Sequence, residues 1–185
     1  MMDTNRRCAW CNLKNPLYVA YHDGEWCRPH TDDAYLYEML VLESFQAGLS
    51  FECVLNKRES FRAAYDGFDI DKVCTYGKEK IAELLENKAL IRHRLKILAS
   101  IQNSRVFKAI STEFGSFYAY IKTFVGDDVI YETGKTKSAV SDAISKDLKK
   151  RGMTFLGSTI IYSYLQATGF IYSHEKECFL HKGNA

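Results

Sequence analysis

The sequence contains only two prolines and eleven glycines among its 185 residues, so little of the chain can be structureless linker. Its longest uninterrupted apolar runs span only a few residues, far fewer than the roughly 20 that a transmembrane helix requires. The first residues, MMDTNRR, have no apolar stretch behind the arginines, so we expect no secretory signal, no membrane association and a cytoplasmic location. At this length one domain spanning 1–185 can bury a sizeable core.

The sequence also lacks any convincing run of alternating apolar and polar residues, the pattern of a half-buried strand. Apolar residues instead recur at helical spacing in several segments. Thr31–Asp33, Ser50, Ser138 and Ser158 are suitable N-caps for four of these segments, and Gly152 is a suitable residue for ending one. The sequence therefore predicts an all-α fold.

One helical segment, 81–97, is predicted to form two short helices joined by a tight hairpin. Arg92 and Arg94 lie where the second helix begins, and the free backbone N–H groups and dipole of a helix start favour an anion. A helix–hairpin–helix motif that binds a DNA phosphate is built in this way. Any antiparallel helix pair has a similar pattern, however, so both interpretations stay open at this point.

The net charge of +2 is too small to require a nucleic-acid partner. The basic residues are nevertheless clustered, at 57–58, 92–96 and 146–151. Such clusters suit phosphates, although each of them alone is also typical of a solvated helix face.

The six cysteines of a chain with no export signal are poor candidates for disulfides. Those near the two ends of the chain lie close to histidines, and they are Cys8, Cys11, Cys27 and Cys178.

Three blocks of sequence together resemble the DNA-3-methyladenine glycosylase I family. The first begins at Cys8 and contains NPLYVAYHDGEW at 15–26, and the second is LESFQAGLSF at 42–51. The third runs from Ser141 through KDLKKRG and FLGST to Cys178. The order and spacing match over nearly the whole chain. The resemblance implies an all-α glycosylase of the helix-hairpin-helix type.

The resemblance also implies a zinc ion that ties the two ends of the chain together, held by Cys8, His22, His174 and Cys178. Such a closed Cys₂His₂ set satisfies tetrahedral zinc and leaves no position for water, so one structural zinc per chain is expected. His174 and Cys178 are spaced i, i+4 and are expected on one face of a helix. Cys11 forms a Cys-x-x-Cys pair with Cys8 and is the alternative ligand.

The implied organisation is a central helical part at 31–137, with the hairpin near 81–97, and a zinc-linked terminal part made of 1–30 and 138–185.

An alkylated adenine such as 3-methyladenine is cationic while it is attached to deoxyribose and leaves as a neutral base. Its excision therefore depends less on a strong general acid than on a pocket with π faces and a carboxylate. The resemblance implies that Glu43 is that catalytic carboxylate. The aromatic residues of the pocket are implied to be Tyr18, Tyr21 and Phe51, completed by Trp10 and Trp26. The alternative for Glu43 is an exposed glutamate on a helix surface, and the alternative for the aromatic residues is ordinary packing in the core.

The turn at 46–50 is the expected DNA-intercalating loop, with Leu49 as the apolar wedge after Gly48. Arg92, Arg94 and Lys150 are the expected phosphate contacts. The chain departs from the family pattern at three positions, since it has Phe51 where tryptophan is usual, and Cys27 and Ala89 where glycine is usual.

The predicted function is a monomeric, monofunctional DNA glycosylase that flips an alkylated adenine out of double-stranded DNA and hydrolyses its N-glycosidic bond. The products are an abasic site and free 3-methyladenine. The alternative is a zinc-stabilised helical module that binds DNA and cuts nothing. Retention of Glu43 with Tyr18 and Tyr21 favours the enzyme, because a module that only binds DNA has no use for a carboxylate in a base pocket.

Overall fold

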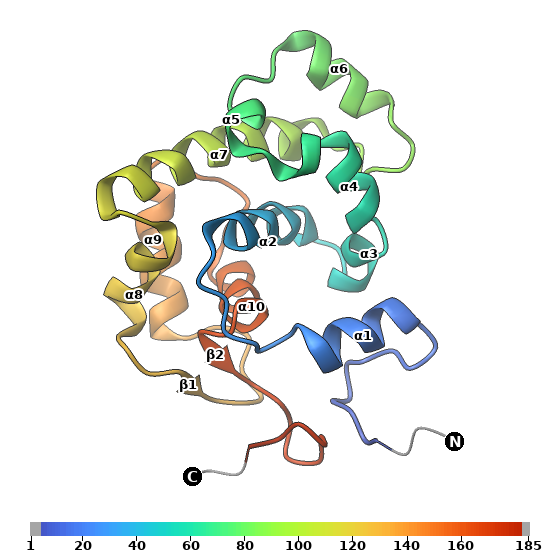
Figure 1. Ribbon diagram of the computed structural model, residues 1–185, viewed down its shortest axis with the longest axis vertical. Helices are drawn as coiled ribbons and strands as arrows, with labels where there is room; N and C mark the ends of the chain where they lie inside the picture. The colour runs from blue at the N-terminus through green and yellow to red at the C-terminus, as the bar shows by residue number, and fades with distance from the viewer. Residues whose placement is uncertain (1–4, 183–185) are drawn as a thin grey trace.

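The computed structural model describes residues 5–182, which are mostly helical (Figure 1). The elements in chain order are α1 (Pro16–Gly24), α2 (Asp33–Gln46), α3 (Phe51–Leu55), α4 (Arg58–Ala64), the 3₁₀ turn η1 (Asp66–Phe68), α5 (Ile70–Val73), α6 (Lys78–Glu86), α7 (Arg94–Phe114), α8 (Phe117–Val125), β1 (Ile130–Tyr131), α9 (Ala139–Lys150), α10 (Ser158–Ala167) and β2 (Ile171–Tyr172). The helical prediction is confirmed. The two parallel strands pair only two residues each, which is too short for an alternating pattern to be visible in the sequence.

Local capping explains where several helices begin. The side chains of Asp32, Ser50 and Ser138 accept hydrogen bonds from the first turns of α2, α3 and α9, as expected. The prediction for Ser158 is wrong, since Gly157 is the N-cap of α10 and Ser158 is its first residue. The Ser158 hydroxyl instead shares a 2.9 Å hydrogen bond with Ser141 Oγ on α9, so it joins two helices.

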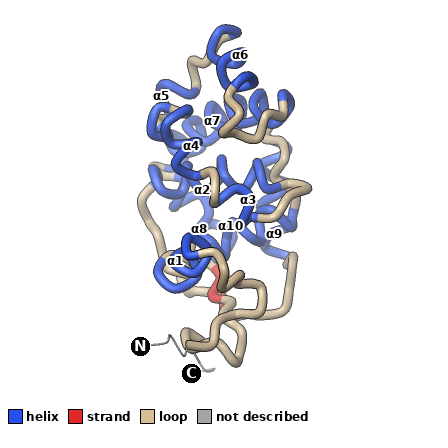
Figure 2. The backbone as a smooth tube through the Cα atoms, turned by 90° about the vertical axis from the view of Figure 1, so that its right-hand side faces the viewer, coloured by secondary structure: helices blue, strands red, loops and turns tan. Residues whose placement is uncertain are grey.

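Helix α2 lies at the centre of the molecule, where it packs against α3, α7, α8 and α10 (Figures 1 and 2). It is buried from Leu36 to Phe45 except at Glu38. Because four helices pack around α2, an ionisable side chain that points into this packing pays a large desolvation cost. Glu43 is such a side chain, only 2% exposed.

Residues 87–93 connect α6 to α7 where the sequence predicted a hairpin between two short helices. The second helix is not short, since α7 has 21 residues. Asn87 Oδ1 accepts a hydrogen bond from Ala89 N at 3.0 Å, and Lys57 Nζ donates to Ala89 O at 2.9 Å. Ala89 does not have a positive φ. Alanine therefore closes this turn without the strain that a left-handed conformation would impose.

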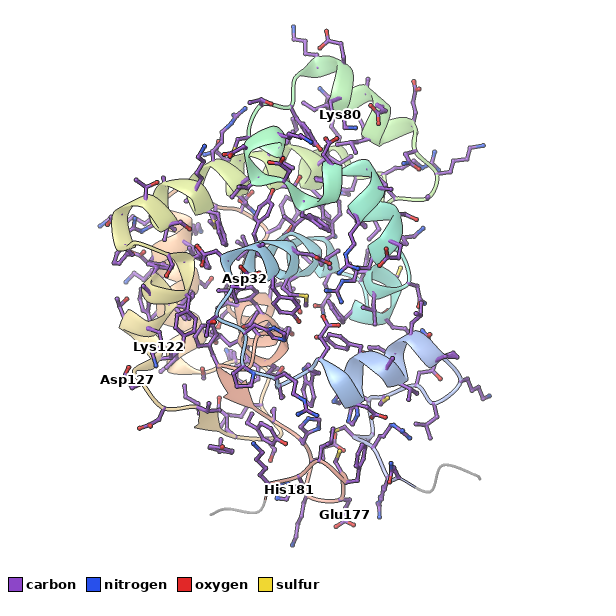
Figure 3. All side chains as sticks on the ribbon, viewed as in Figure 1. Asp32, Lys80, Lys122, Asp127, Glu177 and His181 are labelled. Atoms are coloured by element: carbon purple, nitrogen blue, oxygen red, sulfur yellow. The ribbon has the colours of Figure 1, made fainter. Side chains whose placement is uncertain are left out.

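The two ends of the described chain lie together, opposite α6. Phe179 N donates to Arg6 O at 2.8 Å, and Ala9 N donates to Glu175 Oε2 at 2.7 Å. Figure 3 places Glu177 and His181 at this end and Lys80 of α6 at the other. None of the helices within residues 5–182 combines the length and apolar character needed to cross a bilayer.

Candidate active site and metal centre

A cavity of about 480 Å³ opens between α1, α2 and α10. A volume of this size is typical of small-molecule sites. Its lining includes all six residues that the sequence analysis assigned to a base pocket, namely Trp10, Tyr18, Tyr21, Trp26, Glu43 and Phe51.

The aromatic side chains of this cavity come from α1, its flanks and the start of α3. The rings of Tyr18 and Tyr21 are nearly parallel, with centroids 6.4 Å apart, and Phe51 lies 5.0 Å from Tyr21. Trp10 and Trp26 meet edge to face at 4.7 Å. The cavity therefore presents several π faces, an arrangement suited to a flat and electron-poor ring.

The polar groups of the cavity come mainly from the last turns of α2. Glu43 Oε2 is buried and has no hydrogen-bond partner among the described residues, and the same holds for Gln46 Oε1. Burial raises the pKa of Glu43 well above its ordinary value. Two unpaired acceptors, one turn apart on the same helix, can receive hydrogen bonds from a ligand with donors on its edge.

Sequence reasoning missed much of the opposite wall. Gln46 was assigned only to the wedge turn, although its i+3 spacing from Glu43 was a signal that it faces the same cavity. The other additional lining residues are Gly134, Lys135, Thr136, Ser163, Gln166, Ser173 and Glu175. They carry no signal in the sequence, since they come from the loop before α9, from α10 and from the segment after β2.

Beside the cavity, Cys8, His22, His174 and Cys178 form a buried cluster that could hold a metal ion. Their ligand atoms all lie within 4.8 Å of one another. Cys8 Sγ is 3.6 Å from His174 Nδ1, and Cys178 Sγ is 3.5 Å from both His174 Nδ1 and His22 Nε2. Cys11 is outside this group, and its Sγ lies 3.9 Å from Tyr18 O.

The surroundings of the cluster orient its side chains. His22 Nδ1 lies 2.7 Å from Asp23 Oδ1, and Arg7 donates to the same carboxylate at 2.6 Å. A carboxylate behind a histidine sets its tautomer and leaves Nε2 free as a ligand. Burial, with His22 nearby, lowers the pKa of His174 to about 4, so its imidazole is neutral at pH 7, as metal binding requires.

The prediction that His174 and Cys178 share a helix face is wrong. Both lie in the irregular segment after β2, where Cys178 N donates to Glu175 O at 2.8 Å. The amide of Glu175 points at Cys8 Sγ at 3.4 Å, and the amide of Leu180 points at Cys178 Sγ at 3.5 Å. Because these amides are directed at sulfur atoms, they are not available for the hydrogen bonds of a helix.

The predicted DNA contacts lie on the surface. Arg92, Arg94 and Lys150 are exposed, and Leu49 is 43% exposed on the turn that joins α2 to α3. Gly48 in this turn has a φ of 78°, which favours glycine. Three other residues of the basic clusters interact with groups of the protein itself. Arg58 forms ion pairs with Glu25 and Glu38, and Arg151 forms ion pairs with Glu113 and Asp147. Lys96 donates hydrogen bonds to the backbone carbonyls of Phe45 and Ala47.

Comparisons with known proteins match this chain to one family over nearly its full length. The methyladenine glycosylase family model matches residues 10–181. DNA-3-methyladenine glycosylase 1 of Escherichia coli K12 is 41% identical over 184 residues, which cover 96% of this chain and 98% of the relative.

Two solved structures extend the agreement to the fold. A crystal structure of a 3-methyladenine DNA glycosylase I superposes with a TM-score of 0.91 at 42% identity, covering 96% of this chain and all of the other. The Staphylococcus aureus enzyme, whose structure describes 3-methyladenine recognition, gives 0.88 at 31% identity, with 93% and 94% of the two chains covered. The chain therefore belongs to the methyladenine glycosylase family.

Proposed function

We propose that this protein is a DNA-repair glycosylase that hydrolyses the N-glycosidic bond of 3-methyladenine in double-stranded DNA, leaving an abasic site and free base. The observation that carries the proposal is the buried, unpartnered carboxylate of Glu43 in a cavity lined by aromatic rings. The names of the relatives support the same substrate.

The chemistry fits an alkylated base. In the DNA the base is cationic, so the aromatic faces and a nearby negative charge both attract it. Because burial raises the pKa of Glu43, ionisation of this carboxyl group is disfavoured in the empty cavity and becomes more favourable when a cation arrives. The site thereby favours the charged, damaged base over neutral adenine, which brings no positive charge to stabilise the ionised form of Glu43.

The direct test is incubation of the protein with methylated double-stranded DNA, followed by chromatography of the released bases. We expect release of 3-methyladenine at a rate proportional to protein concentration, and no release of unmodified adenine. If the protein retained the methylated DNA without releasing any base, the binding module would be the correct description.

We also propose that the metal of the Cys/His cluster is one structural zinc ion. Zn–S and Zn–N bonds of about 2.3 and 2.0 Å imply an S···N separation of roughly 3.5 Å along a tetrahedral edge. The three S···N distances, 3.5–3.6 Å, fit this value. The ion would join Cys8 and His22 to His174 and Cys178, and so link the terminal part, 1–30 with 138–185, into a single domain spanning 1–185 around the central part at 31–137.

For DNA binding we propose a helix-hairpin-helix made by α6, α7 and the turn between them. The exposed Arg92 and Arg94 flank the N-terminus of α7, where a phosphate would meet free N–H groups. Leu49 is the proposed wedge, and Lys150 is a proposed further phosphate contact. We expect the protein to act as a monomer.

Phe51 is the proposed stacking platform, and this residue lines the cavity with 9% of its surface exposed. Base stacking on an aromatic ring contributes roughly 1–3 kcal/mol, so Phe51→Ala is expected to weaken free 3-methyladenine binding by about that amount. Phe51→Trp is expected to bind at least as tightly, because indole offers a larger face for stacking than a benzene ring does. Titration with free base, beside a thermal melt of each variant, measures both effects. Lower melting with unchanged affinity of Phe51→Ala would show that Phe51 serves only the core.

A further inference from the structure

Lys96 stands apart from the other basic residues of the predicted hairpin, because its side chain points inward. It is the third residue of α7 and is only 5% exposed, whereas Arg92, Arg94 and Leu95 around it are exposed. Its Nζ donates to Phe45 O at 2.7 Å and to Ala47 O at 2.6 Å. No carboxylate is hydrogen-bonded to this ammonium group among the described residues.

The two carbonyls that Lys96 binds belong to the C-terminal end of α2. The carbonyls of a last helical turn have no partner within the helix and carry a partial negative charge, so a cation is favourable there. Between them, Gln46 O accepts from Leu49 N at 2.6 Å and closes a turn with Gly48 at a φ of 78°. The carbonyl groups of three successive residues are therefore all held, two of them by one side chain.

This turn carries Leu49 between two residues of the cavity, Gln46 before it and Phe51 after it. We propose that Lys96 is a positioning residue for base flipping, which holds the turn so that Leu49 enters the DNA stack while the base enters the cavity. The inference rests on the proposed function. The inward side of the first turn of α7, with Lys96, then supports the wedge, while the exposed side of the same turn, with Arg94, contacts the DNA backbone.

The arrangement has a mechanical consequence. The Lys96 side chain adds a direct link between the N-terminus of α7, where a phosphate would bind, and the turn that carries the wedge, so the two are expected to move together. Lys96→Met keeps the length of the side chain and its packing but leaves both carbonyls without their donor. The turn then loses its fixed position, although the cavity walls on α1 and α10 are untouched.

The test is a double-mutant cycle with Lys96→Met and Leu49→Ala, measured as kcat/KM for base release from methylated duplex DNA. Loss of a charged hydrogen bond corresponds to about a tenfold to hundredfold decrease, and we expect Lys96→Met to fall in this range. If Lys96 acts through Leu49, the double variant will be no slower than the slower single variant. Affinity for free 3-methyladenine is expected to stay within about twofold of wild type, because binding of the free base requires no wedge.

Lys108→Met is the matched control, since Lys108 is an exposed lysine on the same helix that pairs with Asp71, and it is expected to leave activity unchanged. Lys96→Gln, which keeps a donor without the charge, replaces Lys96→Met in the cycle if that variant does not fold. Wild-type rates for Lys96→Met, multiplicative effects in the double variant, or a parallel loss of free-base affinity would each overturn the inference. Wild-type base release in the same assay tests the proposed function separately.

Discussion

Replacing Glu43 with glutamine is expected to slow excision of 3-methyladenine while making the protein harder to unfold. The amide keeps the shape of the carboxyl group but cannot carry the negative charge that attracts a cationic base. A charged hydrogen bond contributes about 1.5–3 kcal/mol, so excision is expected to fall roughly tenfold to hundredfold. The stability gain follows from burial, because Glu43 is 2% exposed and its Oε2 has no partner among the described residues. An ionised carboxylate at this position costs free energy that a neutral amide does not.

The stability gain should depend on pH. The pKa of Glu43 is raised in the folded state, so the folded chain binds a proton more tightly than the unfolded chain does. The contribution of this group is therefore fully present below the unfolded pKa, about 4.3, and is lost as pH rises toward the raised folded value. Glu43→Gln has no such titration. Its melting temperature should exceed that of wild type by a margin that is larger at pH 8 than at pH 5, with about 2–4 °C for each kcal/mol.

Glu59→Gln is the matched control for this experiment, because Glu59 is a helical glutamate whose side chain is 81% exposed. It should change neither excision nor the pH dependence of melting. Calorimetric melts across pH and base-release assays on the same preparations supply both readouts. A Glu43→Gln protein with wild-type excision would remove Glu43 from the chemistry, whatever its stability.

Loss of one ligand of the Cys/His cluster is expected to have the largest effect on stability. In isolated zinc-finger peptides the structural metal contributes about 10–16 kcal/mol, and even a part of that, at about 2–4 °C per kcal/mol, lowers melting by roughly 10 °C or more. Cys178→Ala should therefore melt earlier and contain no zinc by elemental analysis. Wild-type protein treated with a strong chelator should approach the same melting temperature.

Cys11→Ala is the control that separates a ligand from a buried thiol. Cys11 is 6% exposed, close to the 4% of Cys178, but its Sγ lies outside the cluster. This variant is expected to keep one zinc ion per chain and most of its stability. Equal metal content in the two variants would refute the assigned ligand set, and zinc loss from Cys11→Ala alone would identify Cys11 as the ligand.

The cluster also touches the cavity, so a lost metal should have a smaller second effect there. Trp26 lies 4.8 Å from His174 and Trp10 lies 5.3 Å from His22, measured between ring centroids, and both tryptophans line the cavity. Histidines released from a metal hold these rings less firmly. Weaker binding of free base by the folded fraction of Cys178→Ala would be the sign of this coupling.

Local sequence information was sufficient for the helical class of the fold, for the starts of three helices and for one side of the site. Apolar spacing and the caps Asp32, Ser50 and Ser138 act within a few residues, so they can be read without knowing what packs against them. The family motifs added Glu43 and the aromatic residues. All of these lie on α1, α2 and α3 or directly beside them, in one continuous stretch of chain.

Tertiary packing decided the remainder. Lys135, Gln166 and Glu175 meet Glu43 only because α10 and its neighbouring loops fold back beside α2, and no local pattern marks them. In the sequence Lys96 cannot be distinguished from its exposed neighbours Arg92 and Arg94. Its side chain is buried because two carbonyl groups at the end of α2 accept its hydrogen bonds. His174 and Cys178 had helical spacing, yet amides of their segment are directed at sulfur atoms. In each case the group that determines the position of the side chain lies far away in the sequence. The free energy of such a contact depends on tertiary packing, which the local spacing of apolar residues does not specify.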